Sequence, residues 1–139
     1  MVKNADLAYQ FIDSMPYARA LGMRLNVLGD GLVEISMDYD SSFVGDVNTG
    51  VIHGGAVSAL MDTCCGIAVI CHESAPRSTA TIDLRIDYMR PATPKQSIKT
   101  QAECYHMTRN IAFTRATTFD VDTSRPVATA SGAFTVERH

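Results

Sequence analysis

A run of sixteen residues, Ala56 to Cys71, constrains this chain most, because it is mainly apolar and contains a single charged residue, Asp62. A run of this length without proline exceeds an ordinary strand and indicates a helix. A helix that is apolar on nearly every side is a buried one, so other elements must cover it. The sequence therefore predicts a long central helix that carries one carboxylate among apolar side chains.

Two glycines, Gly54 and Gly55, come directly before this run, where the first turn of the helix is expected. The first N–H groups of a helix have no partner inside it and form the positive end of its dipole. Because glycine has no side chain, a ligand oxygen can approach these groups closely. We interpret the glycine pair as a helix start that binds an oxyanion.

The spacing between the glycines and the acid has a further consequence. Gly55 and Asp62 are seven residues apart, which places them on one helix face but about 10 Å apart along the axis. One carbonyl group cannot lie within hydrogen-bond distance of both. A second, antiparallel copy of the helix would bring its Asp62 opposite Gly54, so the spacing favours a site shared by two subunits.

Each feature also has a plain explanation when it is taken alone. A glycine pair before a helix is often a simple turn, and one aspartate in a helix is often solvated at an exposed edge. Taken together they favour a functional site, because an acid on an apolar helix is costly unless it has a partner or a task.

The other elements follow from the alternation of apolar and polar residues and from turn residues. A helix is predicted for residues 4–15, with Asn4 as its N-cap. Strands are predicted for residues 23–28, 32–37, 79–89, 97–105, 111–121 and 127–136. In the third of these, alternation assigns Ile82 and Leu84 to one side and Thr81 to the other. The predicted class is α+β, with a curved antiparallel sheet of about six strands wrapped round the long helix.

His53-Gly54-Gly55, followed by Asp62 on a central apolar helix, resembles the hotdog-fold acyl-CoA thioesterases of the PaaI-like type, from the phenylacetate pathway. Asn48, residues 16–22 and residues 87–92 extend the resemblance over nearly the whole chain. It implies a single hotdog domain over residues 1–139, in which residues 1–22 form an N-terminal helix and lead-in.

The resemblance also implies catalytic roles for four residues. Asp62 activates water as a general base or attacks the carbonyl as a nucleophile, and both routes stay open. The Gly54 N–H polarises the thioester carbonyl. His53 orients the glycine loop and contributes to carbonyl binding, although a structural histidine explains it equally well. Asn48 orients the water or the thioester.

Substrate binding is assigned to five residues. Gly55 shares the helix start, and Thr81 stands where some relatives use a hydroxyl to hold the water, although its strand propensity also explains it. Coenzyme A carries several phosphate charges, and Arg90, Arg109 and Arg125 each follow a predicted strand or lie in a turn. Each of these arginines alone could instead be a solvated surface residue.

Composition limits the compartment and the partners. The net charge of −3 argues against nucleic acid. The four cysteines fit small buried side chains in a reducing compartment, and we expect no metal and no cofactor. The chain shows no signal peptide and no apolar segment long enough to span a membrane, so we expect a cytoplasmic protein. The resemblance implies a homodimer that pairs further into a homotetramer.

Two classes of function remain open at this point. The first is an acyl-CoA thioesterase acting on aryl or medium-chain acyl groups, and the second is a non-catalytic acyl-CoA-binding hotdog domain. The second would predict loss of the acid at position 62, so Asp62 favours the enzyme. A hotdog hydratase or dehydratase would be expected to carry an Asp closely followed by a His at the helix start. This pattern is absent, because Asp62 is followed by Thr63-Cys64-Cys65-Gly66.

Overall fold

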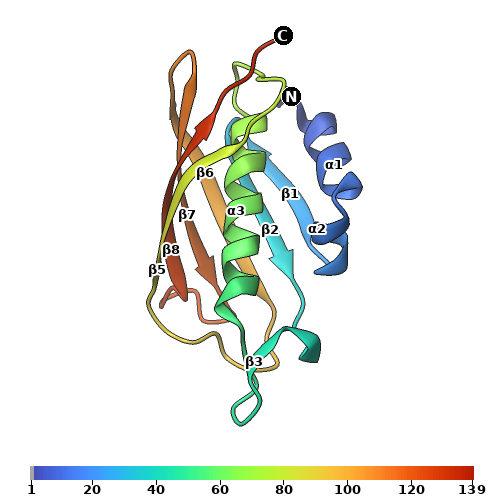
Figure 1. Ribbon diagram of the computed structural model, residues 1–139, viewed down its shortest axis with the longest axis vertical. Coiled ribbons are helices and arrows are strands. Elements are labelled where there is room, and N and C mark those ends of the chain that lie inside the picture. Colours follow the sequence, from blue (N-terminus) through green and yellow to red (C-terminus); the bar gives the residue numbers. More distant parts are fainter. Residues whose placement is uncertain (1) are drawn as a thin grey trace.

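A six-stranded antiparallel sheet curves around one long helix in the structure, a computed structural model that describes residues 2–139 (Figure 1). Met1, the first residue of the predicted domain, lies outside the described residues. The strands, in their order across the sheet, are β1 (Arg24–Gly29), β2 (Leu32–Met37), β6 (Ile98–Met107), β7 (Ile111–Phe119), β8 (Ala128–Thr135) and β5 (Thr81–Tyr88). The predicted α+β class and strand number are confirmed.

The central helix, α3 (Gly54–Ile70), begins at the glycine pair, where its first turn is predicted. It lies along one face of the sheet, in contact with β2, β6 and β7 (Figure 1). Ten of its residues are buried, so it forms the centre of the core, as its composition predicts. All four cysteines are buried and free. No helix within residues 2–139 is long and apolar enough to cross a membrane.

Two short helices, α1 (Ala5–Ser14) and α2 (Pro16–Ala20), lie beside β1 and α3 (Figure 1). Asn4 is the N-cap residue of α1, as predicted, but its side chain makes no capping hydrogen bond. It adopts a left-handed conformation, which asparagine tolerates, and its amide donates hydrogen bonds to the carbonyl oxygens of Ile70 and Pro76, at 3.1 and 3.0 Å. The carbonyls at a helix end lack partners inside the helix, so Asn4 ties the start of α1 to the end of α3.

A β-bulge in β5 overturns the predicted alternation of that strand. The pairing with β8 shifts by one residue between Thr81 and Asp83, which leaves Ile82 as the extra residue. As a result Thr81 and Leu84 both face α3, whereas the side chain of Ile82 is 54% exposed. The bulge therefore turns the Thr81 hydroxyl towards the central helix.

The segment of residues 40–50, between β2 and α3, has structure of its own. It contains a short 3-10 helix, η1 (Ser41–Phe43), and the strand β3 (Val44–Asp46), which pairs with β4 (Val51–Ile52) in a small hairpin. This hairpin projects beyond the start of α3 (Figure 1). The side chain of Asp46 accepts a hydrogen bond from the Asn48 N–H and so fixes the hairpin turn.

Beside this end of α3, the buried Asp120 forms a two-pronged ion pair with Arg90, with N–O distances of 2.7 and 2.8 Å. Thr93 also donates to this carboxylate from its N–H and its hydroxyl. The Arg90 guanidinium, which forms the strongest of these contacts, holds the pKa of Asp120 well below its usual range. Arg90 additionally donates to the Arg125 carbonyl, so the ion pair joins two loops.

Replacing Arg90 with alanine is expected to cost about 3 kcal/mol of unfolding free energy, because it leaves a buried carboxylate unpaired. Arg24→Ala is the matched control, because Arg24 makes an equally two-pronged pair with Asp38 that is 58% and 71% exposed, against 15% and 0% for Arg90 and Asp120. The control should cost less than about 1 kcal/mol. Urea unfolding of both variants measures the difference, and equal costs would contradict the structural role of Arg90.

The same ion pair predicts a pH dependence of stability. The pKa of Asp120 is lower in the folded state than in the unfolded state, where it is near 3.8. The contribution of Asp120 to the unfolding free energy is therefore complete above the unfolded-state pKa and is lost as pH falls through the folded-state pKa. The stability gap between wild type and Arg90→Ala should therefore stay constant from about pH 8 to 5 and narrow below about pH 4.

Candidate functional site

The start of α3 is organised by His53, which is its N-cap residue. The Nδ1 atom of His53 accepts a hydrogen bond from the Gly55 N–H at 2.7 Å. Nδ1 is therefore the unprotonated nitrogen in this geometry, and the histidine acts on the backbone of the glycine pair. The predicted orienting role of His53 matches this contact, whereas the N–H of Gly55, predicted to bind substrate, already has a partner.

The N–H of Gly54 has no hydrogen-bond partner among the described residues. It is the first residue of α3, where the helix dipole favours negative charge. The Gly54 carbonyl accepts a hydrogen bond from the hydroxyl of Tyr88, at 3.0 Å, and Tyr88 lies at the end of β5. The Gly54 N–H is thus left available as a hydrogen-bond donor. The backbone that carries it is held by two hydrogen bonds, one from the Tyr88 hydroxyl to the Gly54 carbonyl and one from the Gly55 N–H to His53.

Gly55→Ala should displace His53 from its cap, because a Cβ at position 55 would lie 2.8 Å from His53 Nδ1. Loss of an N-cap costs about 1 kcal/mol, so we expect Gly55→Ala and His53→Ala each to lower the unfolding free energy by about that amount. A double-mutant cycle tests the shared cause. In the His53→Ala background, the added Gly55→Ala change should lower the unfolding free energy only a little. Fully additive losses of unfolding free energy would mean that Gly55→Ala acts by some cause other than loss of the His53 cap.

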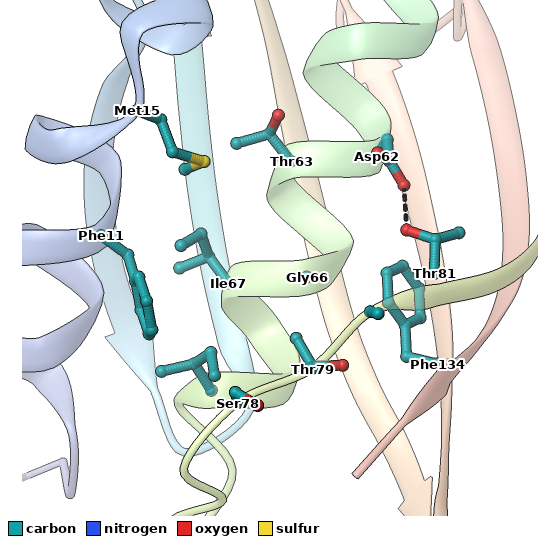
Figure 2. Close-up of a pocket in the computed structure, with 12 residues that line it drawn as sticks. Phe11, Met15, Asp62, Thr63, Gly66, Ile67, Ser78, Thr79, Thr81 and Phe134 are labelled. Carbon is teal, nitrogen blue, oxygen red and sulfur yellow. Dashed lines mark hydrogen bonds between the residues drawn. The ribbon is translucent and has the colours of Figure 1, made fainter. Parts of the chain in front are cut away.

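Asp62 lies eight residues after Gly54, in the middle of α3. Its Oδ1 accepts a hydrogen bond from the Thr81 hydroxyl at 2.7 Å (Figure 2). This contact exists because the bulge in β5 turns Thr81 inwards. The hydrogen bond fixes the orientation of the carboxylate and leaves its second oxygen for another group.

Asp62 and Thr81 stand at the side of a groove between α3, α1 and the segment that leads into β5 (Figure 2). The groove has a volume of about 240 Å³. Its walls include Phe11 of α1, Met15 directly after α1, and Ile67 of α3. The Asp62 carboxylate therefore borders a mostly apolar groove.

Within one chain, Gly54 and Asp62 do not meet. Eight residues of helix separate them by about 12 Å along the axis, so one carbonyl cannot contact both groups. Both groups face β5, since Tyr88 contacts one and Thr81 the other. β5 is an edge strand of the sheet, and Ile82, Tyr88 and the adjacent Met89 are each more than half exposed along it.

The remaining predicted site residues are not brought together. Asn48 is exposed in the β3–β4 turn, where its backbone N–H binds Asp46. Arg125 lies near the start of α3 and pairs with the half-buried Asp122. Arg109 lies in the β6–β7 turn, near the other end of α3. Arg90 forms the ion pair with the buried Asp120, which gives it a structural task, and its predicted phosphate contact stays a prediction.

None of the cysteines is suited to be the attacking group. Burial raises the pKa of the Cys65, Cys71 and Cys104 thiols to about 11, and it also raises the pKa of the Cys64 thiol well above its usual range. The thiolate is the nucleophilic form, and it is scarce at neutral pH at such values. Residues 2–139 contain no group of three or more His, Cys, Asp or Glu side chains placed to hold a metal ion.

Sequence reasoning missed three residues that shape the site. Tyr88 lies within the 87–92 segment that resembles known thioesterases, but its contact with Gly54 joins positions 34 residues apart. Phe11 and Met15 show only the apolar spacing of an ordinary amphipathic helix. Apolar spacing of this kind predicts that one face of the helix is covered, but it does not show whether a ligand or the protein core covers that face.

A family model described as the thioesterase superfamily matches residues 49–127, more than half of the chain. The chain is 29% identical over 94 residues to a medium/long-chain acyl-CoA thioesterase, YigI, of Salmonella typhimurium, in a match covering 58% of this chain and 61% of that protein. It is 30% identical over 93 residues to a putative esterase of Halobacterium salinarum, covering 63% and 60%. The chain thus spans about three fifths of the length of these relatives.

Solved structures share the fold over nearly the full chain. A protein from Pseudomonas aeruginosa superposes with a TM-score of 0.83 at 35% identity, covering 94% of this chain and 96% of that one. The E. coli PaaI protein, from the phenylacetic acid degradation operon, gives 0.82 at 19% identity, covering 93% and 89%, which is a likeness of fold alone. The chain therefore belongs to the thioesterase superfamily, with the PaaI-like hotdog fold that the pattern of His53-Gly54-Gly55 and Asp62 predicts.

Proposed function

We propose that this protein is an acyl-CoA thioesterase that hydrolyses aryl- or medium-chain acyl-CoA to the free acid and coenzyme A. The observation that carries the proposal is the pairing of two features on one helix. The Gly54 N–H at the helix start has no partner within residues 2–139, and Asp62 is held by Thr81 beside an apolar groove. A donor for an oxyanion and a base for water are what hydrolysis of a thioester requires.

The site is proposed to form between two copies of the chain. Because about 12 Å of helix separates Gly54 from Asp62, a carbonyl that contacts Asp62 must take its hydrogen bond from Gly54 of the partner subunit. Antiparallel pairing of two β5 edges would place the two helices side by side in this way, and it would cover the exposed Ile82 and Met89. The homodimer is the smallest unit of the proposal, and further pairing into a homotetramer follows from the resemblance.

In the general-base route, one carboxylate oxygen of Asp62 takes a proton from water while the water oxygen bonds to the thioester carbon. The carbonyl oxygen becomes an oxyanion and accepts the hydrogen bond from Gly54 N–H. When the carbonyl re-forms, the carbon–sulfur bond breaks, and the departing thiolate receives the proton from Asp62. In the nucleophilic route, Asp62 itself bonds to the carbon, expels the thiolate and leaves an anhydride for water to cleave. Thr81 holds Oδ1 in place in both routes.

Coenzyme A phosphates are proposed to contact Arg125 or Arg109. These two side chains lie near opposite ends of α3, so one chain cannot present both to the same nucleotide. Asn48, in the projecting β3–β4 turn, is proposed to reach the thioester only when substrate or the partner subunit closes the site. A cytoplasmic location accompanies the proposal, because acyl-CoA is an intracellular substrate.

The test is a release assay for free thiol with purified protein and a panel of phenylacetyl-, benzoyl- and straight-chain acyl-CoAs. Turnover of at least one thioester, together with a dimer or larger assembly by analytical ultracentrifugation, is the expected result. If no thioester is hydrolysed while non-hydrolysable thioether analogues still bind, the chain is instead an acyl-CoA-binding hotdog domain.

A further inference from the structure

We infer that the groove beside Asp62 is the subsite for the acyl tail, that it takes unbranched chains of medium length, and that Gly66 and Phe11 set the length. This inference rests on the proposed function and narrows its substrate class from aryl or medium-chain acyl groups to extended alkyl chains.

The shape of the groove fits a chain better than a ring. It follows α3 from Asp62 to Ile70, a rise of about 12 Å, which would hold roughly eight to ten carbons of extended chain. Its volume of about 240 Å³ falls below the range of about 300 Å³ and more that is typical of whole-ligand pockets. The space therefore suits one narrow arm of a substrate, while coenzyme A must lie outside it.

The chemistry of the groove changes along its length (Figure 2). At one end, Asp62 and Thr81 supply the polar groups that face a reacting carbonyl. Towards the other end, the hydroxyls of Ser78 and Thr79 are bonded to Glu137 and to the Thr135 carbonyl. These two residues consequently contribute little free polarity to the wall, and the far end is apolar.

Gly66 forms part of this wall and has no packing reason to be glycine. Glycine inside a helix is less stable than alanine, because it loses more backbone entropy. A Cβ at position 66 would meet only Phe134, at 3.8 Å, which is ordinary contact. Since Gly66 lines the groove, the missing side chain keeps the groove open where it passes over α3.

The opposite wall belongs to α1. Phe11 and Met15 are four residues apart, so they lie on one face of that segment, and both line the groove (Figure 2). The two hydrogen bonds from Asn4 to Ile70 and Pro76 fix α1 against the end of α3. The free space in the groove, and with it the length of chain that the groove can hold, is thus set by Gly66 on one side and by Phe11 on the other.

The experiment compares kcat/KM for butyryl-, octanoyl-, decanoyl- and palmitoyl-CoA across variants. For wild type, each added methylene should raise kcat/KM about three- to fourfold up to roughly eight to ten carbons, and longer chains should gain nothing more. Gly66→Leu should lower the decanoyl-to-butyryl ratio at least tenfold, because its side chain fills the groove. Phe11→Ala should move the optimum to longer chains. Gln10→Ala, an exposed change on α1, is the control and should leave the ratio unaltered.

Thermal unfolding of each variant separates folding from selectivity. Gly66→Ala should melt at the same temperature as wild type or higher, and should narrow the chain-length profile less than Gly66→Leu. The inference would be overturned if neither Gly66→Leu nor Phe11→Ala changed the ratio of kcat/KM for decanoyl-CoA to that for butyryl-CoA. If wild type hydrolyses nothing, the proposed function fails, and calorimetry with S-alkyl-CoA thioethers of the same lengths still decides whether Gly66 and Phe11 select the chain.

Discussion

Asp62→Asn is expected to lower kcat for acyl-CoA hydrolysis by about 10²–10⁴-fold, because an amide neither accepts a proton from water nor attacks the thioester. The fold should survive, since asparagine keeps an oxygen that can accept the 2.7 Å hydrogen bond from Thr81. Substrate KM should change little, because the loss falls on the chemical step rather than on binding. Thiol release under saturating substrate measures the effect.

Two controls make this result specific. Asp13→Asn applies the same substitution to an exposed acid of α1 and should leave kcat unaltered. Thr81→Val removes the hydroxyl but keeps the carboxylate, and should cost about tenfold, the value of one hydrogen bond to a charged group. If Asp62→Asn retained kcat within a few fold of wild type while Tm was unaltered, Asp62 would have no part in the reaction.

The hydrogen bond between Asp62 and Thr81 also shows which features of this structure could not be predicted from the sequence pattern. Periodicity gave the central helix and the six strands, because burial of a face leaves a regular mark in the sequence. The β5 bulge at Ile82 breaks that regularity by one residue, and nothing local to the strand signals it. Strict alternation therefore placed Thr81 on the wrong side of the sheet.

Contacts between distant residues were the other part that the sequence could not supply. Asn4 has the chemistry of an N-cap, but it binds carbonyls more than sixty positions away. Arg90 has the chemistry of a phosphate ligand, but it meets Asp120 across the fold. Each residue type was interpreted by its commonest local use, and tertiary structure gave it another partner. The contact of His53 with the glycine pair could be expected from the sequence because Gly55 is only two residues away, whereas its role in carbonyl binding stays a prediction.

Gly54→Pro is expected to lower kcat by about 10²–10³-fold, the usual loss when one oxyanion donor is removed. Proline can replace Gly54 without disturbing the backbone. Gly54 is the first residue of α3, where proline is tolerated, and its φ is not positive. His53 has ψ of 137°, which suits the residue before a proline. The change therefore removes the unpartnered N–H and leaves the helix in place.

Gly54→Ala is the matched control for the added atoms. A Cβ at position 54 would lie 3.5 Å from the Tyr88 ring, which is ordinary contact, and alanine keeps the N–H. We expect this variant to stay within a few fold of wild type, with both variants melting within a few degrees of it. Equal losses in the two variants would show that bulk beside Tyr88, rather than the N–H, is what the reaction cannot tolerate.

Co-expression of Asp62→Asn with Gly54→Pro tests whether the two groups act across subunits. A mixed dimer holds one site with an intact Asp62 from one chain and an intact Gly54 from the other, and a second site that lacks both. Random pairing makes half of the dimers mixed, so activity should recover to about a quarter of wild type. A single-chain site would leave the mixture as inactive as its parents. Mixing Asp62→Asn with the double variant creates no intact site and should stay inactive, which separates true complementation from stabilisation by the partner.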